Sequence, residues 1–179
     1  MNPAAGFSTP PLRRRLACLL YEGMLVFGLL MVTGFLHALV TQQPYVPGDN
    51  HGAGWVALAA MALYFVWFWH HGQTLAMKTW FITVQDVRTG QPPHWLRALA
   101  RFAGAWLMIL PALALVSLLG LISPRSGVYA AVALNVLVYA GLSVWLPGRQ
   151  FLHDWLAGTA LVDLRRQPLT TPEPGRPPL

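Results

Sequence analysis

Two charged residues that could do chemistry lie in or beside an otherwise apolar stretch. Glu22 is inside the first long apolar run, and Arg15 precedes it by seven residues. Two helical turns span roughly 10 Å, so both side chains would share one face of a helix. A carboxylate in hydrocarbon is costly unless it is paired, protonated or facing a polar cavity. Glu22 is therefore a candidate site for binding and releasing a proton or small cation, with Arg15 tuning its affinity.

A second acidic residue, Asp154, could complete a polar cluster with this pair. It follows the last long apolar run, in a segment expected to return to the same membrane boundary as Arg15. Arg149 and His153 lie close to it in the sequence and extend the predicted cluster. We expect Arg15 to contact Asp154 or Glu22 at ion-pair distance. Two interpretations stay open: a proton or cation path, and a structural ion network that docks the C-terminal segment beneath the helices.

The composition indicates an integral membrane protein. Of 179 residues, 55% are hydrophobic and 10% are charged, against roughly 25% charged residues in soluble domains. The net charge of +6 comes from basic residues that flank the apolar runs. This pattern favours the anionic inner leaflet of a bilayer as a partner and argues against nucleic acid.

Several kinds of active site are not expected. The single cysteine excludes an intrachain disulfide. The histidines lack the spacing of metal ligands, so neither a metal nor a cofactor is expected. The sequence has no nucleophile beside a base, no phosphate-binding loop and no dinucleotide motif, and we therefore do not expect an enzyme.

Four apolar runs approach the length of about 20 residues that spans a bilayer. The third run has Arg101 near its start and Pro111 in its middle, where a kink is expected. Every Lys and Arg except Arg125 would lie on one side, so the positive-inside rule predicts a multi-pass inner-membrane protein with both termini cytoplasmic. The predicted spans are residues 16–40, 55–71, 99–121 and 128–146.

The segment between the second and third runs should leave the bilayer. Residues 80–85 are rich in β-branched and aromatic side chains, and residues 86–90 resemble a turn. This pattern predicts a short strand or hairpin on the cytoplasmic face, and the alternative is an interfacial helix over residues 74–79.

After the fourth run, residues 149–160 place Phe151, Leu152, Trp155 and Leu156 on one helical side. That arrangement predicts an interfacial amphipathic helix. Residues 1–12 are predicted to be a flexible tail, and the Pro-rich residues 163–179 to be disordered.

Three motifs along the chain are distinctive. They are Arg14-Arg15-Leu16-Ala17 with Glu22, Gly72-Gln73-Thr74-Leu75 with Lys78 and Val84-Gln85-Asp86, and Arg149 to Thr159 (RQFLHDWLAGT). Together they resemble the RDD family of membrane proteins over residues 13–162, and the last motif is the most specific. The resemblance implies an integral membrane protein of mostly unassigned activity, with cation/proton antiport attached to some members. It also implies that the arginine and two aspartates after which the family is named fall on Arg15, Glu22 and Asp154. Glu22 departs from that pattern, because it keeps the carboxylate but adds a methylene.

The sequence thus predicts an all-α membrane protein: a bundle of four transmembrane helices with a short cytoplasmic strand or hairpin and a C-terminal interfacial helix. We expect a non-catalytic membrane scaffold or accessory factor, because the later spans lack the deep polar residues that a transport path needs. The alternative is a proton or small-cation transporter that uses Glu22 with Arg15 and Asp154. The expected partners are the bilayer and either a second copy of the chain or another membrane protein.

Overall fold

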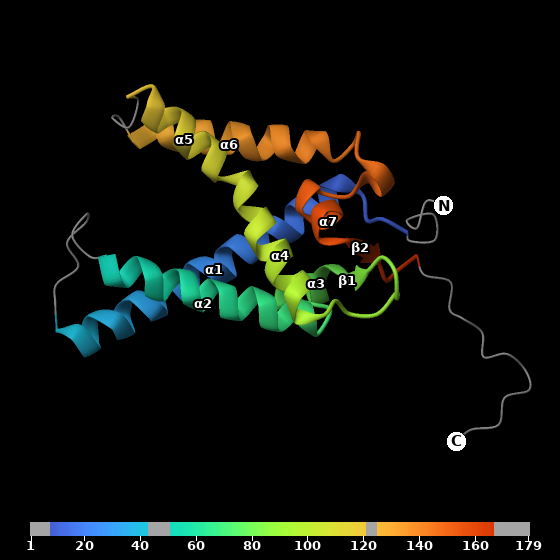
Figure 1. Ribbon diagram of the computed structural model, residues 1–179, viewed down its shortest axis with the longest axis horizontal. Coiled ribbons are helices and arrows are strands. Elements are labelled where there is room, and N and C mark those ends of the chain that lie inside the picture. Colours follow the sequence, from blue (N-terminus) through green and yellow to red (C-terminus); the bar gives the residue numbers. More distant parts are fainter. Residues whose placement is uncertain (1–7, 43–50, 121–124, 167–179) are drawn as a thin grey trace, which may run out of the picture.

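The computed structural model describes residues 8–42, 51–120 and 125–166, and every structural statement below concerns these residues. It is mostly helical, with one small sheet (Figure 1). The elements in chain order are α1 (Leu12–Thr41), α2 (His51–His70), α3 (Leu75–Trp80), β1 (Ile82–Asp86), α4 (Trp95–Ala105), the 3-10 helix η2 (Trp106–Met108), α5 (Leu110–Leu118), α6 (Arg125–Leu142), the 3-10 helix η3 (Pro147–Arg149), α7 (Leu152–Ala157) and β2 (Thr159–Asp163).

Three helical stretches are long and apolar enough to cross a membrane: Leu12–Thr41, Gly52–His70 and Trp95–Leu118. The predicted fourth span corresponds to α6. Its apolar part, Ser126–Leu142, is shorter than the about 20 residues that a bilayer requires. Length and composition therefore support three spans and one shorter apolar helix in the described part of the chain.

The burial pattern of α1 is the reverse of that in a water-soluble helix. Only Arg15, Cys18 and Glu22 are buried among its 30 residues. Their spacing of three and four residues places them on one stripe. Large apolar side chains face outward, including Leu20 at 73% and Val40 at 82% exposure. An apolar surface of this size requires an apolar surrounding, as a bilayer provides.

The predicted kink at Pro111 is a full interruption of the helix. α4 is followed by η2, and α5 begins with Pro111 in its first turn. An N–H in the first turn has no acceptor within the helix, so the missing N–H of proline costs no hydrogen bond there. The carbonyl of Leu107, four residues earlier, loses its helical donor. Asn135 of α6 replaces that donor, because its Nδ2 donates to the carbonyls of Leu107 at 3.3 Å and Met108 at 2.7 Å.

The predicted strand is confirmed as β1, but its partner is the C-terminal strand β2. The two pair antiparallel, from Ile82 opposite Asp163 to Asp86 opposite Thr159. The helical alternative also forms, because α3 immediately precedes β1. A lone strand leaves its backbone groups unpaired, and a segment distant in sequence satisfies them here.

The predicted amphipathic helix over residues 149–160 is wrong in extent. α7 has six residues and is followed by Gly158, whose φ of +65° leads into β2. Trp155 and Leu156 are exposed, whereas His153 and Asp154 are buried. Two of the predicted polar residues therefore face other elements of the protein.

The N-terminal and C-terminal described segments meet at one end of the molecule (Figure 1). The backbone N–H of Asp163 donates to the carbonyl of Ser8 at 2.7 Å, and Gln150 Nε2 donates to Thr9 Oγ1 at 2.9 Å. Asp163, where the sequence suggests that the tail begins, is the last residue of β2. Most of both predicted tails, residues 1–7 and 167–179, lies outside the described residues.

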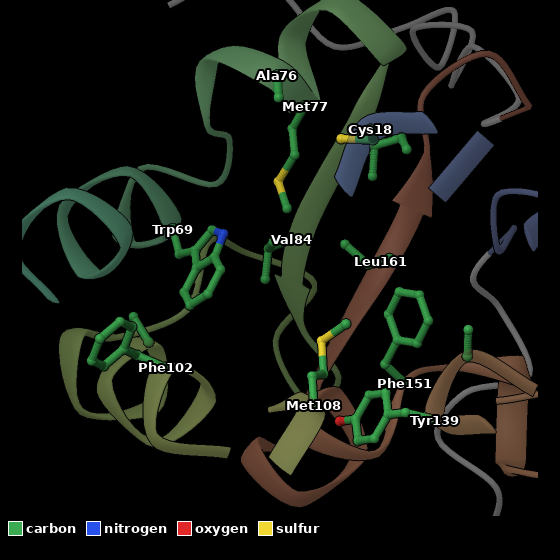
Figure 2. Close-up of a cluster of buried hydrophobic side chains, with 13 residues drawn as sticks. Cys18, Trp69, Ala76, Met77, Val84, Phe102, Met108, Tyr139, Phe151 and Leu161 are labelled. Carbon is green, nitrogen blue, oxygen red and sulfur yellow. The ribbon is translucent and has the colours of Figure 1, made fainter. Parts of the chain in front are cut away.

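Two helical hairpins, α1 with α2 and α5 with α6, are joined by α4, which packs against both α2 and α7. In Figure 1 the hairpins diverge away from the sheet, and α7 and the sheet lie at the end where α1 begins. The main core is at this end, hereafter the sheet end. Figure 2 shows its side chains, among them Cys18, Trp69, Met77 and Phe151.

Candidate functional site

Glu22 is hydrogen-bonded by two other elements. Tyr64 of α2 donates its hydroxyl to Glu22 Oε1 at 2.7 Å, and the hydroxyl of Thr74 donates to Oε2. Thr74 also caps α3, because its Oγ1 accepts the backbone N–H of Met77 at 3.2 Å. Both carboxylate oxygens are therefore engaged, and one buried side chain connects α1, α2 and the start of α3.

Asp154 is paired with Arg101. It lies in the first turn of α7 and is completely buried, and one of its oxygens forms an ion pair with Arg101 Nη1 from α4. The guanidinium of Arg101 also stacks on the indole of Trp69, 4.5 Å from the ring centroid. Gly104 allows α4 to approach α7 this closely, since a Cβ there would lie 3.0 Å from His153 Cβ.

His153 is held as a neutral hydrogen-bonding group. Its backbone N–H donates to the Tyr139 hydroxyl at 2.9 Å, and that hydroxyl lies 2.7 Å from its own ring Nδ1. The Tyr139 proton then points to Nδ1, which leaves the ring proton on Nε2, 3.6 Å from Asp154 Oδ1. Burial, and next the positive charge of Arg101, hold the pKa of His153 well below its usual value.

Arg15 is buried but does not form the predicted ion pair. In the part of the chain that the structure covers, it pairs with neither Glu22 nor Asp154. Its Nη2 donates to Ser143 Oγ at a long 3.5 Å, and its guanidinium lies 4.6 Å from the ring centroid of Phe151. The expectation is wrong because nearer groups already engage both carboxylates.

Arg149 is also outside the cluster. It is exposed in η3, with a φ of +54°, so the predicted role beside Asp154 is wrong. The closest basic residue to Asp154 comes instead from α4, the helix that packs against α7. Sequence proximity to Asp154 therefore did not place Arg149 at the site.

Most of these groups meet at one cavity of about 340 Å³. Arg15, Glu22, Arg101 and His153 line it, and the rest of the lining is mainly apolar side chains. The sequence indicated three of these four residues. Arg101 was missed as a cluster member although the same signal was available, namely a charge close to the start of a long apolar run.

Two further ion pairs connect helices to the strands at the sheet end. Arg14 binds both oxygens of Asp163, at 2.9 and 2.7 Å, and Arg97 Nη1 lies 2.8 Å from Asp86 Oδ1. Burial alone would raise the pKa of Asp163, but the hydrogen bonds from Arg14 and the Arg165 backbone N–H outweigh it and hold the pKa below its usual value. These pairs connect the start of α1 to β2 and the start of α4 to β1.

No group of three His, Cys, Asp or Glu side chains within the described ranges is placed to hold a metal ion. The two carboxylates of the cluster are bound within the chain, Glu22 by Tyr64 and Thr74 and Asp154 by Arg101. The arrangement is therefore suited to docking elements together or to binding a ligand in the cavity.

Comparison with known proteins places this architecture in a family. The model of the RDD family matches residues 9–158, which include Arg15, Glu22, Arg101 and Asp154. No curated protein and no solved structure matches the chain. The chain belongs to the RDD family, and its long apolar helices are those of a membrane protein.

Proposed function

We propose that the protein is a non-catalytic membrane scaffold or accessory factor, and that its buried polar cluster is structural. The supporting observation is that both cluster carboxylates are engaged within the chain. Glu22 accepts hydrogen bonds from Tyr64 and Thr74, and Asp154 pairs with Arg101. Each of these contacts joins different helices, as expected of a network that fixes their positions.

The sheet end is the surface that the scaffold presents to the cytoplasm. Both described chain ends meet there, which agrees with a multi-pass inner-membrane topology with both termini cytoplasmic. Exposed cations around the sheet suit the anionic inner leaflet. We further propose that the protein works as a homo-oligomer or with another membrane protein. The exposed cations around the sheet include Lys78, Arg88, Arg165 and Arg166.

One observation favours a second function, the transport of a proton or small cation. Glu22 lines the cavity together with Arg101. A carboxylate beside a cavity in an apolar region could exchange a proton if water reached it. The scaffold proposal is preferred because both oxygens of Glu22 are already bound by hydroxyl groups, and Asp154 lies behind Arg101.

Flux measurements separate the two functions. The full chain and its Glu22→Gln and Asp154→Asn variants would be reconstituted in proteoliposomes, and proton and sodium flux would be compared with protein-free vesicles. A scaffold gives the background flux in all samples. Wild-type flux above background that Glu22→Gln abolishes would overturn the scaffold proposal.

A second readout tests the structural role of the cluster. Both variants should reduce the yield of folded protein from membranes, because each disturbs a buried network. Arg149→Gln is the matched control, since Arg149 is exposed and outside the cluster. Equal yields for all three variants would contradict the proposed role.

A further inference from the structure

One cation in the lining of the cavity, Arg15, forms no ion pair among the described residues. Arg15 is 3% exposed, and its Nε and Nη1 have no hydrogen-bond partner among the described residues. Its remaining contacts are the long hydrogen bond to Ser143 and the ring of Phe151. A buried guanidinium with free donors is costly unless an acceptor satisfies it. An oxyanion is the acceptor that a guanidinium binds best.

Apart from Arg15, Glu22, Arg101 and His153, the lining of the cavity is mainly apolar, and the cavity has the size of a small ligand site. Its volume of about 340 Å³ lies at the lower end of the roughly 300–1,000 Å³ of such sites. Trp69, Met77, Met108, Phe151 and Leu161 line the cavity, and Figure 2 shows their side chains. These walls suit a hydrocarbon chain rather than a hydrated ion.

The cavity opens toward the apolar surface of the helices. Leu19 and Gly23 of α1, and Ile109 before α5, line it and are themselves exposed. All three lie in stretches long and apolar enough to cross a membrane. A molecule could therefore enter sideways from the lipid without crossing the aqueous phase.

We propose that this cavity binds a single-chain anionic amphiphile from the membrane, with its oxyanion on Arg15 and one acyl chain among the apolar walls. The shared chemistry is a carboxylate or phosphate joined to a hydrocarbon chain. A free fatty acid and one chain of an anionic phospholipid are its two sources. Glu22 lines the same cavity, but both of its oxygens accept hydrogen bonds within the chain, so the proposed binding group is Arg15. The proposal does not depend on whether the protein is a scaffold or a transporter.

Tryptophan quenching by brominated chains tests the proposal. Trp69 and Trp106 line the cavity, and bromine quenches indole fluorescence on contact. The full chain in phosphatidylcholine vesicles would be titrated with dibrominated stearate and, separately, with dibrominated phosphatidylglycerol. The neutral controls are dibrominated methyl stearate and dibrominated phosphatidylcholine, which report contact with bulk lipid. The expected result is saturable quenching by an anionic probe in excess of its neutral control.

Two pairs of variants locate the site. Arg15→Met should weaken the excess quenching about tenfold, the usual loss for one charged hydrogen-bonding partner, whereas Arg13→Met, on an exposed neighbour, should leave it unchanged. Gly23→Leu should abolish it by filling the opening. Gly28→Leu is the control, since Gly28 is outside the cavity lining and a Cβ at either glycine meets no atom within 4 Å. If Arg15→Met does not fold, the comparison of Gly23→Leu with Gly28→Leu still tests where the probe binds.

Each outcome decides the proposal. Excess quenching in the stearate arm alone assigns a free carboxylate, and excess in the phosphatidylglycerol arm assigns a phospholipid. Equal quenching by anionic and neutral probes would overturn the proposal. Excess quenching that persists unchanged in Arg15→Met or in Gly23→Leu would overturn it as well.

Discussion

The two ends of α1 differ in what they contact. At the sheet end, its buried residues Arg15, Cys18 and Glu22 face other elements. Toward Thr41 no residue of the helix is buried, and large apolar side chains such as Phe35 are exposed at 68%. Two of the three buried residues of α1 are thus charged, whereas the large apolar side chains toward Thr41 are exposed. This is expected where hydrocarbon surrounds the protein, because apolar packing between helices then has little advantage over contact with lipid.

The largest effect should come from breaking the buried ion pair at the sheet end. Arg101→Met leaves Asp154 buried without its counter-ion, which we expect to lower the free energy of unfolding by about 3–5 kcal/mol. The measurement is denaturant or thermal unfolding in detergent. The double variant Arg101→Met/Asp154→Leu should recover much of the loss, because neither charge is then left alone. A double variant as unstable as the single would contradict the pairing.

A smaller effect is expected from comparing two positions along α1. Glu22→Ala leaves the hydroxyls of Tyr64 and Thr74 without an acceptor and should cost about 1–3 kcal/mol. Met31→Ala, at a residue that is 57% exposed, should change stability by at most about 0.5 kcal/mol. The same unfolding assay measures both. Similar losses in the free energy of unfolding for Glu22→Ala and Met31→Ala would contradict the difference between the ends of the helix.

Replacing glycine by alanine should lower stability at Gly158, at the sheet end, and raise it at Gly28, inside α1. Gly158 has a φ of +65°, and a Cβ there would lie 2.9 Å from Arg97 Nη1; Gly158→Ala should therefore cost about 1–2 kcal/mol. Gly28 is inside α1 with open space around it, so Gly28→Ala should stabilise the helix by up to about 1 kcal/mol. Thermal unfolding of both variants measures the difference. The contrast would fail if both substitutions changed stability in the same direction.

The smallest expected effect is present at neutral pH and disappears in acid. The pKa of Asp163 is lowered in the folded protein, so its contribution to stability is present above the unfolded pKa of roughly 4 and is lost as the pH falls through the folded value. Arg14→Gln should lower the melting temperature at neutral pH, and the difference from wild type should shrink below about pH 4. Arg13→Gln is the matched control. A difference that stays constant with pH would contradict this role of Asp163.

Much of the helical framework was accessible from local patterns in the sequence. The apolar runs predicted α1, α2 and the α4–α5 stretch, because length and hydropathy are properties of a single segment. The β-branched run predicted β1 in the same way. The unusual position of Glu22 in an apolar run also indicated that it is buried.

The partners of the charged residues could not be predicted in this way. Arg15 and Glu22 share a face, yet the partners of Glu22 come from α2 and the start of α3, more than forty residues away. Asp154 pairs with Arg101 because α4 and α7 cross, which no periodicity shows. Likewise, β2 was assigned partly to a helix, because its strand character depends on the unpaired edge of β1.

The late position of Asp154 and β2 in the chain has a consequence for biogenesis. The N-terminal helices are synthesised first, so Arg101 is made before its counter-ion Asp154. In the same way, β1 is made before its partner strand β2. Synthesis of residues 154–163 neutralises the charge of Arg101 and completes the sheet. A chain released before these residues are made would therefore carry an unpaired cation and an open strand edge.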